Sequence, residues 1–94
     1  MLWFCEYTWY PGTSAEEVRQ RVIQQHHAGT NRQDQIRGWY DLVGGGAGFL
    51  IVESDDPAQL NLMLTPYMDL MGFDVRAITE NDYDTTIARL QDGA

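Results

Sequence analysis

Short, dense apolar runs alternate with helical apolar stripes along this chain of 94 residues. The first run, residues 2–10, is rich in aromatic and other strand-favouring residues, and a proline–glycine pair ends it. Ser14 and Glu17 then have the spacing of a capping box, and apolar positions recur at helical spacing until Gly29. The pattern therefore predicts a strand over residues 2–10 and a helix over residues 14–28.

A glycine-rich turn between two apolar runs fixes the middle of the chain. Gly44, Gly45 and Gly46 can supply the positive φ angles that a tight hairpin needs. We therefore expect strands over residues 36–43 and 47–54, joined by this hairpin.

The second half of the chain repeats the order of a helix followed by a strand. Asp56 is suited to an N-cap, and Pro66 should kink the helix that follows or restart it as a short turn. Residues 73–79 predict the fourth strand. Asn81 and Asp82 are both candidate caps of a short C-terminal helix, whose apolar stripe is Tyr83, Ile87 and Leu90.

This element order is that of the ferredoxin-like βαββαβ fold, in the α+β class. Such a fold has a four-stranded antiparallel sheet with two helices on one face. We expect residues 1–80 to form this domain and residues 81–94 to form a short helical extension of it. The expected strand order is four, one, three, two, with strands one and three as parallel neighbours.

The sheet should also be covered on its second face. The first and third strands are apolar in both alternating phases, whereas a sheet face left in water should be polar. The apolar patch would approach the largest that monomers usually expose. We therefore expect a homodimer, formed through the open sheet face around a two-fold axis.

Composition narrows the partners and the chemistry. The net charge of −8 disfavours nucleic acid and anionic membrane surfaces. All six basic residues are arginines, so Schiff-base chemistry on a lysine is excluded. Cys5 is the only cysteine, which rules out a disulfide within the chain. With no apolar stretch near the roughly 18 residues of a membrane span, we expect an unexported, cytoplasmic protein.

Several short stretches resemble the small bacterial proteins classed as domain of unknown function 3303. The resemblance covers residues 1 to about 79 and leaves the residues after 80 outside. It rests on Leu2-Trp3-Phe4, Arg37-Gly38-Trp39, Gly48-Phe49, Asp55-Asp56-Pro57, and Phe73-Asp74-Val75.

That family is similar in turn to the dimeric α+β barrel superfamily, in which two ferredoxin-like sheets face each other. The resemblance therefore implies the same dimer as the apolar strands do. It implies no particular activity, since the superfamily holds cofactor-independent monooxygenases, isomerases, cyclases, haem enzymes and proteins without demonstrated catalysis.

Three residues are candidates for acid–base catalysis. Glu6 and Glu53 both follow apolar runs on strands expected to be neighbours, and two close carboxylates would separate into an acid and a base. The alternative is that each glutamate pairs with an arginine, Arg76 or Arg37, or lies in water. His26 continues the apolar face of the first helix and is a candidate base, although the helix dipole alone also favours a histidine there.

Aromatic residues are numerous enough to line a site for a flat organic ligand. The candidate ligand-binding residues are Trp39, Tyr40, Arg76 and Tyr67, with Tyr40 as a hydrogen-bond donor and Arg76 holding an anion. We expect no metal, because His26 and His27 diverge on a helix and no third ligand has a recognisable spacing. We also expect no cofactor.

Two functions follow from these features. The first is a small homodimer that binds an aromatic or otherwise flat organic molecule, either without catalysis or with cofactor-independent proton transfer or oxygenation. The second is a protein-interaction or regulatory module without catalysis, which uses the sheet face and the C-terminal helix for assembly. A cavity between the sheet and the helices would favour the first, and a filled interior the second.

Overall fold

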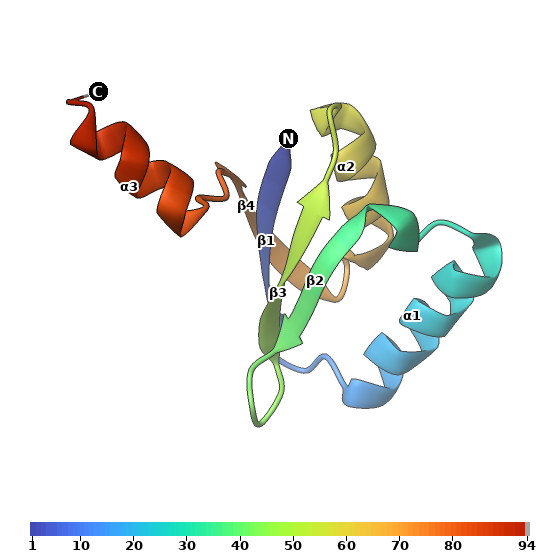
Figure 1. Cartoon of the computed structure of the whole chain (residues 1–94). Helices are drawn as coiled ribbons and strands as arrows, with labels where there is room; N and C mark the ends of the chain where they lie inside the picture. Colours follow the sequence, from blue (N-terminus) through green and yellow to red (C-terminus); the bar gives the residue numbers. More distant parts are fainter. Residues whose placement is uncertain (94) are drawn as a thin grey trace.

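The computed structural model describes residues 1–93 and contains one four-stranded antiparallel sheet in the order β2-β3-β1-β4. The strands are β1 (Leu2–Trp9), β2 (Ile36–Asp41), β3 (Ala47–Glu53) and β4 (Met71–Ile78). Helices α1 (Ala15–Ala28) and α2 (Pro57–Leu64) lie on the same side of the sheet (Figure 1). The ferredoxin-like βαββαβ order predicted from the sequence is confirmed. Short 3-10 turns, η1 (Gln33–Gln35) and η2 (Thr65–Tyr67), precede β2 and follow α2.

Local sequence signals set the helix boundaries. The capping box is formed, with the Ser14 side chain and the Glu17 amide 3.1 Å apart and the reciprocal bond also 3.1 Å long. Gly29 ends α1 in the left-handed conformation at φ 74°. Asp56 caps α2 by accepting a hydrogen bond from the Ala58 amide, and the chain restarts as η2 at the turn containing Pro66.

The hairpin between β2 and β3 is formed as the three glycines predict. Gly44, Gly45 and Gly46 have φ angles of 100°, 83° and 84°, a region that side chains strongly disfavour. The hairpin pairs Tyr40 with Phe49 across the two strands. It therefore fixes which residues of β2 share a face with those of β3.

The expected parallel pairing of strands one and three is wrong. β1 and β3 are antiparallel, with Leu2 opposite Glu53 and Glu6 opposite Phe49. The crossover through α1 makes β1 and β2 parallel, and β3 lies between them in the reverse direction because the hairpin turns the chain. Glu6 and Glu53 consequently lie on one face but four positions apart, about 13 Å along the strands.

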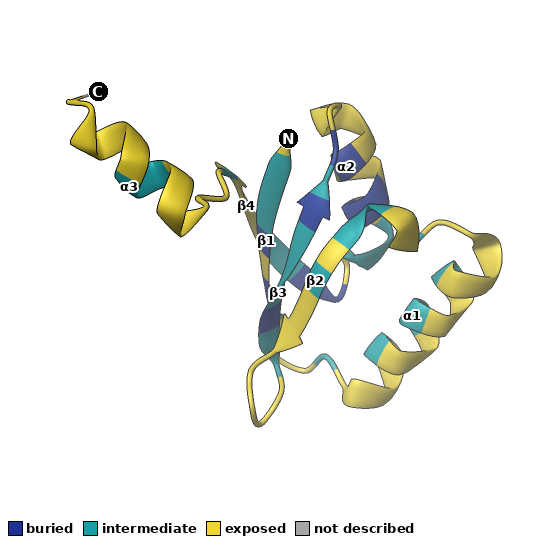
Figure 2. Cartoon of the chain, viewed as in Figure 1, coloured by how far each residue is buried: buried dark blue, intermediate teal, exposed yellow. Residues whose placement is uncertain are grey.

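The two faces of the sheet differ in cover. Cys5 and Val52 are fully buried and pack with residues of α2 to form the main core. The opposite, open face carries an apolar patch in the alternate phase of the same strands. Its members are Leu2, Phe4, Tyr40, Phe49, Ile51 and Ile78. No helix within residues 1–93 covers that face, and buried residues are few in the strands (Figure 2).

Helix α3 (Tyr83–Gln91) extends away from the end of β4, on the side of the sheet opposite to α1 and α2 (Figure 1). Its N-cap is Asp82, one of the two predicted candidates. The principal extents of the molecule, 52 × 28 × 17 Å, reflect this projection. The extension was expected to run to Ala94, which lies outside the described residues.

No helix among residues 1–93 is both long and apolar enough to span a membrane.

Candidate functional site

A chamber of about 540 Å³ lies between the helix-bearing face of the sheet and α1, and η2 closes part of it. Its volume falls within the range of small-molecule sites. Most of its wall is apolar or aromatic, and polar side chains occur at a few positions. Its lining includes Tyr7, Val22, His26, Asn31, Trp39, Asp41 and Tyr67.

The chamber exists because α1 is not packed tightly on the sheet along its length. Every residue of α1, all within the described part of the chain, keeps appreciable solvent exposure, whereas α2 buries three residues in the core. Arg21 attaches α1 to the rest of the molecule: its guanidinium donates to both carboxylate oxygens of Asp69, at 2.6 and 3.0 Å, and to the Pro66 carbonyl. This fork holds the helix beside η2 while Val22 and His26 face the chamber.

Tyr7 carries the main polar group on the sheet wall. It projects from β1 across β3, where Gly48 leaves room: a Cβ on Gly48 would come within 2.7 Å of Tyr7 Cζ. The Tyr7 hydroxyl donates to Asp41 on β2, and Trp39 Nε1 donates to the Tyr7 oxygen at 3.1 Å. Two strands, β1 and β2, thus contribute to one hydrogen-bonded cluster that spans β3 and is formed by Tyr7, Trp39 and Asp41.

The electrostatics of this cluster keep Tyr7 protonated. The pKa of Tyr7 is raised to about 12: burial is the largest cause, the hydrogen bond to the Asp41 carboxylate and its charge add to the rise, and the hydrogen bond from Trp39 opposes it. The phenol is therefore a neutral donor, and the carboxylate beside it is an acceptor.

A second polar group lies on the helix side. The Tyr67 hydroxyl donates to Asn31 Oδ1, while Asn31 Nδ2 donates to the Val22 carbonyl at 3.1 Å. Burial raises the pKa of Tyr67, and the charge of Arg21 and the bond to Asn31 oppose the rise. The chamber consequently has neutral phenol groups on two of its walls.

The structure divides the residues predicted for the site into two sets. His26, Trp39 and Tyr67 line the chamber. The others lie on or beside the open face of the sheet, away from the chamber, and are Glu6, Glu53, Tyr40 and Arg76. The proposed pairing of Glu6 with Glu53 as an acid and a base therefore has no geometric support.

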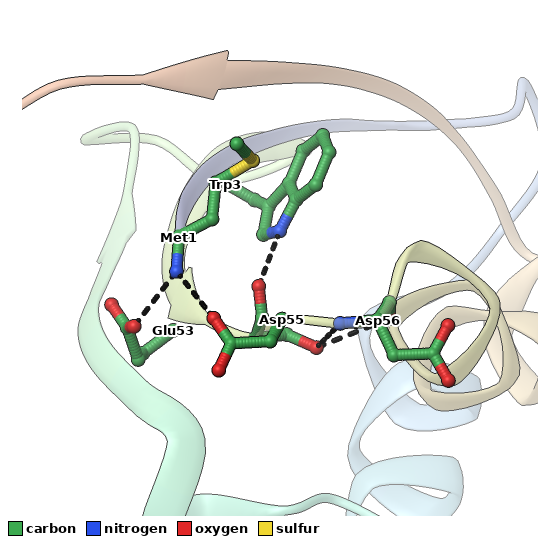
Figure 3. Close-up of polar contacts among 6 residues, drawn as sticks. Met1, Trp3, Glu53, Asp55 and Asp56 are labelled. Atoms are coloured by element: carbon green, nitrogen blue, oxygen red, sulfur yellow. Dashed lines mark hydrogen bonds and ion pairs between the residues drawn. The ribbon is translucent and has the colours of Figure 1, made fainter.

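The two glutamates are not paired with arginines either. Among the ion pairs of residues 1–93, Glu53 binds the N-terminal amine of Met1 at 2.9 Å, and Asp55 binds the same amine (Figure 3). Arg76 pairs with Asp74 on its own strand. These exposed contacts hold the ends of strands rather than form a site.

Sequence analysis missed Asp41 and Asn31 as chamber residues. Asp41 has a detectable signal, since it ends β2 in the same alternating phase as Trp39, where an inward-facing carboxylate is unusual. Asn31 lies in an irregular loop, so no periodicity points to it. Among residues 1–93, no three potential ligands cluster as a metal site would need.

Comparisons with known proteins agree with the fold. A family model described as domain of unknown function (DUF3303) matches residues 1–91. The match extends through α3, so the expectation that residues after 80 lie outside the family is wrong. No curated protein matches the chain.

Two solved structures are similar to this one. The first is 5-chloro-2-hydroxyhydroquinone dehydrochlorinase (TftG) from Burkholderia phenoliruptrix, in complex with 2,5-dihydroxybenzoquinone. It has a TM-score of 0.65 and 18% identity, with 86% of this chain and 96% of that chain covered. The second is Rv0793 from Mycobacterium tuberculosis, with a TM-score of 0.49, 15% identity, and coverage of 85% and 95%. The first similarity supports the ferredoxin-like fold expected for the α+β barrel superfamily.

Proposed function

We propose that this chain, which belongs to the DUF3303 family, binds a small, flat, hydroxylated aromatic molecule in the chamber between its sheet and α1. The observation that carries the proposal is the chamber itself, about 540 Å³ in volume, with aromatic walls and a few fixed polar groups. Apolar walls supply affinity for a ring, and convergent polar groups fix its orientation.

The polar groups favour hydroxyl or carbonyl substituents over charged ones. The Tyr7–Asp41 pair offers an acceptor carboxylate and a neutral phenol, and the Tyr67–Asn31 pair offers a second neutral group. Arg21, the cation closest to this region in the hydrogen-bond network, is already held by Asp69. A strongly anionic ligand would therefore find no free cationic partner among the polar groups described above.

Calorimetric titration tests binding directly. The probe is 2,5-dihydroxybenzoquinone, chosen because TftG, a protein of the same fold, is in complex with it. Val22→Trp should fill the chamber and weaken binding by at least about 10-fold, whereas the matched variant Leu62→Trp, on the exposed side of α2, should bind as the original protein does. Equal binding by both variants would contradict the proposal.

Proton transfer without a cofactor is the chemistry that these side chains support best. His26 presents an imidazole to the chamber, and imidazole is the side chain suited to taking up and returning a proton near neutral pH. The ring hydroxyl can give its proton to His26, the resulting phenolate can take up a proton from the imidazolium at a ring carbon to form a ketone tautomer, and loss of a proton from that carbon to the imidazole restores the ring, so no oxidant or metal is needed.

Hydrogen–deuterium exchange at the ring carbons of 1,2,4-benzenetriol, followed by proton NMR, measures this reaction. His26→Gln should lower the protein-catalysed rate by about 100-fold or more, and His27→Gln, which changes the neighbour outside the chamber wall, should leave it unchanged. Exchange no faster with the protein than without it would restrict the function to binding.

The open face of the sheet supports a homodimer. Phe4, Phe49 and Tyr40 form a row of stacked or tilted rings there, with centroids 4.9 and 5.0 Å apart. The rings belong to three adjacent strands, so they make one continuous apolar surface. A second copy related by a two-fold axis would bury it against itself. The same surface is the observation that favours the second candidate function, an interaction module without catalysis.

A further inference from the structure

Helix α3 carries an apolar stripe that its own chain leaves uncovered within residues 1–93. Tyr83, Ile87 and Leu90 share one side of the helix, and the side chains of Tyr83 and Leu90 are 77% and 56% exposed. The helix is nevertheless well defined at its start, because Asp82 accepts a hydrogen bond from the Thr85 amide at 3.0 Å. An amphipathic helix with no packing partner gains most of its stability from the surface on which it docks.

A groove of about 470 Å³ lies on the open face, at the end of the sheet from which α3 departs. Its floor is apolar and is made by Leu2, Ile51 and Ile78. The Tyr40 ring forms one wall and lies over Gly38, where a Cβ would come within 2.8 Å of Tyr40 Cε2. The groove is therefore shaped by side chains of all four strands.

The area of the open face suggests what fills this groove. Four strands of six to eight residues present about 450 Å² in projection, and a stable interface usually buries about 800 Å² on each partner. Part of that face is charged, with Glu6, Asp74 and Arg76 on β1 and β4. The groove that receives the helix is part of this face, so a reciprocally exchanged helix of nine residues adds roughly 130 Å² only where it is given, which brings each share closer to the usual value.

The helix and the rim of the groove both carry charges of both signs. Asp84 and Arg89 lie on opposite flanks of the apolar stripe. The rim has Arg37 on one strand and the acidic groups Glu53 and Glu80 elsewhere, and Glu53 is already paired with the N-terminal amine of Met1. Apolar contact, rather than charge, is therefore what favours docking of the stripe.

We propose that α3 of one copy docks in the groove on the open face of a second copy, and that the two copies exchange these helices reciprocally. We assign α3 of a second copy to the groove because α3 projects away from the sheet of its own chain. It does so on the side of the open face, where the second copy would bind (Figure 1). The inference rests on the proposed pairing of two copies through the open face. It adds the element that completes that interface.

Chemical cross-linking between two variants, each with one added cysteine, tests the exchange. Gln91→Cys places a thiol at the end of α3, and Arg37→Cys places one at the rim of the groove, while the native Cys5 is fully buried. A mixture of the two variants, treated with a short bismaleimide, should give at least about 10 times more covalent dimer than either variant alone. Linkage only within single chains of the double variant would show that α3 folds onto its own groove and would overturn the proposal, as would no linkage.

A matched pair of charge substitutions gives a second readout. Ile87→Asp, in the apolar stripe, should raise the dimer dissociation constant at least about 10-fold in sedimentation experiments, and Ala88→Asp, on the opposite side of α3, should change it less than about 2-fold. Circular dichroism checks that both variants keep their helices. If Ile87→Asp leaves the dimer intact while a charge at Phe49 dissociates it, the pairing stands and the helix exchange is wrong.

Discussion

At the scale of single residues, Gly48 determines where Tyr7 can lie. Gly48 is opposite Tyr7 in the β1–β3 register, and the Tyr7 ring occupies the space that any side chain at Gly48 would need. A Cβ there would also collide with the Tyr40 carbonyl oxygen. The chamber wall therefore depends on the absence of a side chain at a buried position near the start of β3.

Gly48→Ala should destabilise the protein by about 3 kcal/mol, the upper end of the usual cost of overpacking. Gly72→Ala is the matched control: it also lies in a strand, and its Cβ would meet Tyr10 Cε1 at 3.5 Å, an ordinary contact. Urea unfolding of both variants measures the difference. A loss in Gly48→Ala no larger than that in Gly72→Ala would contradict the packing described here.

Tyr7 should also make stability depend on pH in the alkaline range. Since folding raises the pKa of Tyr7 to about 12 from its usual 10, the stabilisation is complete below about pH 10 and is lost as the pH rises through about 12. The difference in unfolding free energy between the original protein and Tyr7→Phe should shrink by as much as about 2 kcal/mol over this interval. A difference that stays constant with pH would show that the phenol is not held by burial and by Asp41.

Among the predicted site residues, His26 on α1, Trp39 on β2 and Tyr67 on η2 face the chamber, and those on the open face do not. His26 could be placed from helical spacing, because the periodicity of α1 is regular. Glu6 and Glu53 could not be placed in this way. The sheet face on which each lies depends on strand phase, and the distance between them depends on strand direction. A strand that is apolar in both phases leaves the phase undetermined. Tyr7 acquires its polar role only through Gly48 and Asp41, which are distant from it in sequence.

At the scale of elements, α1 is the most weakly packed part of the chamber. Its side chains Val22 and Ile23 face the chamber, while Val18 also packs against the smaller core cluster around Tyr7. Arg21 provides the main polar attachment. A helix with few buried contacts opens at low free-energy cost. Ligand bound between α1 and the sheet would supply the missing contacts.

Amide hydrogen exchange should therefore separate α1 from the core strands. Without ligand, amides of α1 should exchange at least about 10 times faster than those of β1 and β3, and 2,5-dihydroxybenzoquinone should slow α1 selectively. Arg21→Met, which removes the fork to Asp69, should speed exchange in α1 further. Equal protection of the amides of α1 and of the strands against exchange would contradict a helix that is weakly packed on the sheet.

Most elements could be predicted because their signals are local. The capping box at Ser14, the three glycines of the hairpin and the Asp56–Pro57 start of α2 act within a few residues of themselves. The predicted direction of β3 relative to β1 was wrong, because the pairing of these strands depends on the path of the connection through α1. The space left between α1 and the sheet is likewise a tertiary property, so the stripe on α1 alone could not predict whether a cavity or a packed interior lies there.

At the scale of the whole molecule, the open face and α3 both lack cover from the described part of their own chain. Phe49→Asp places a charge in the centre of the stacked rings and should convert the dimer to monomers, with at least about a 100-fold rise in the dissociation constant. Leu62→Asp is the matched control, since it adds the same charge to the exposed side of α2. Sedimentation velocity distinguishes the two. A monomeric original protein, or a dimer unaffected by Phe49→Asp, would contradict pairing through this face.

The most direct test of the central claim is a crystal structure of the protein grown with 2,5-dihydroxybenzoquinone. If the chamber is the binding site, electron density for the ring should lie between the sheet and α1. The ring should be within hydrogen-bond distance of the Tyr7–Asp41 pair and in contact with His26 and Trp39. A structure in which α1 packs directly on the sheet and fills the chamber with Val18, Val22 and Ile23 would contradict this prediction.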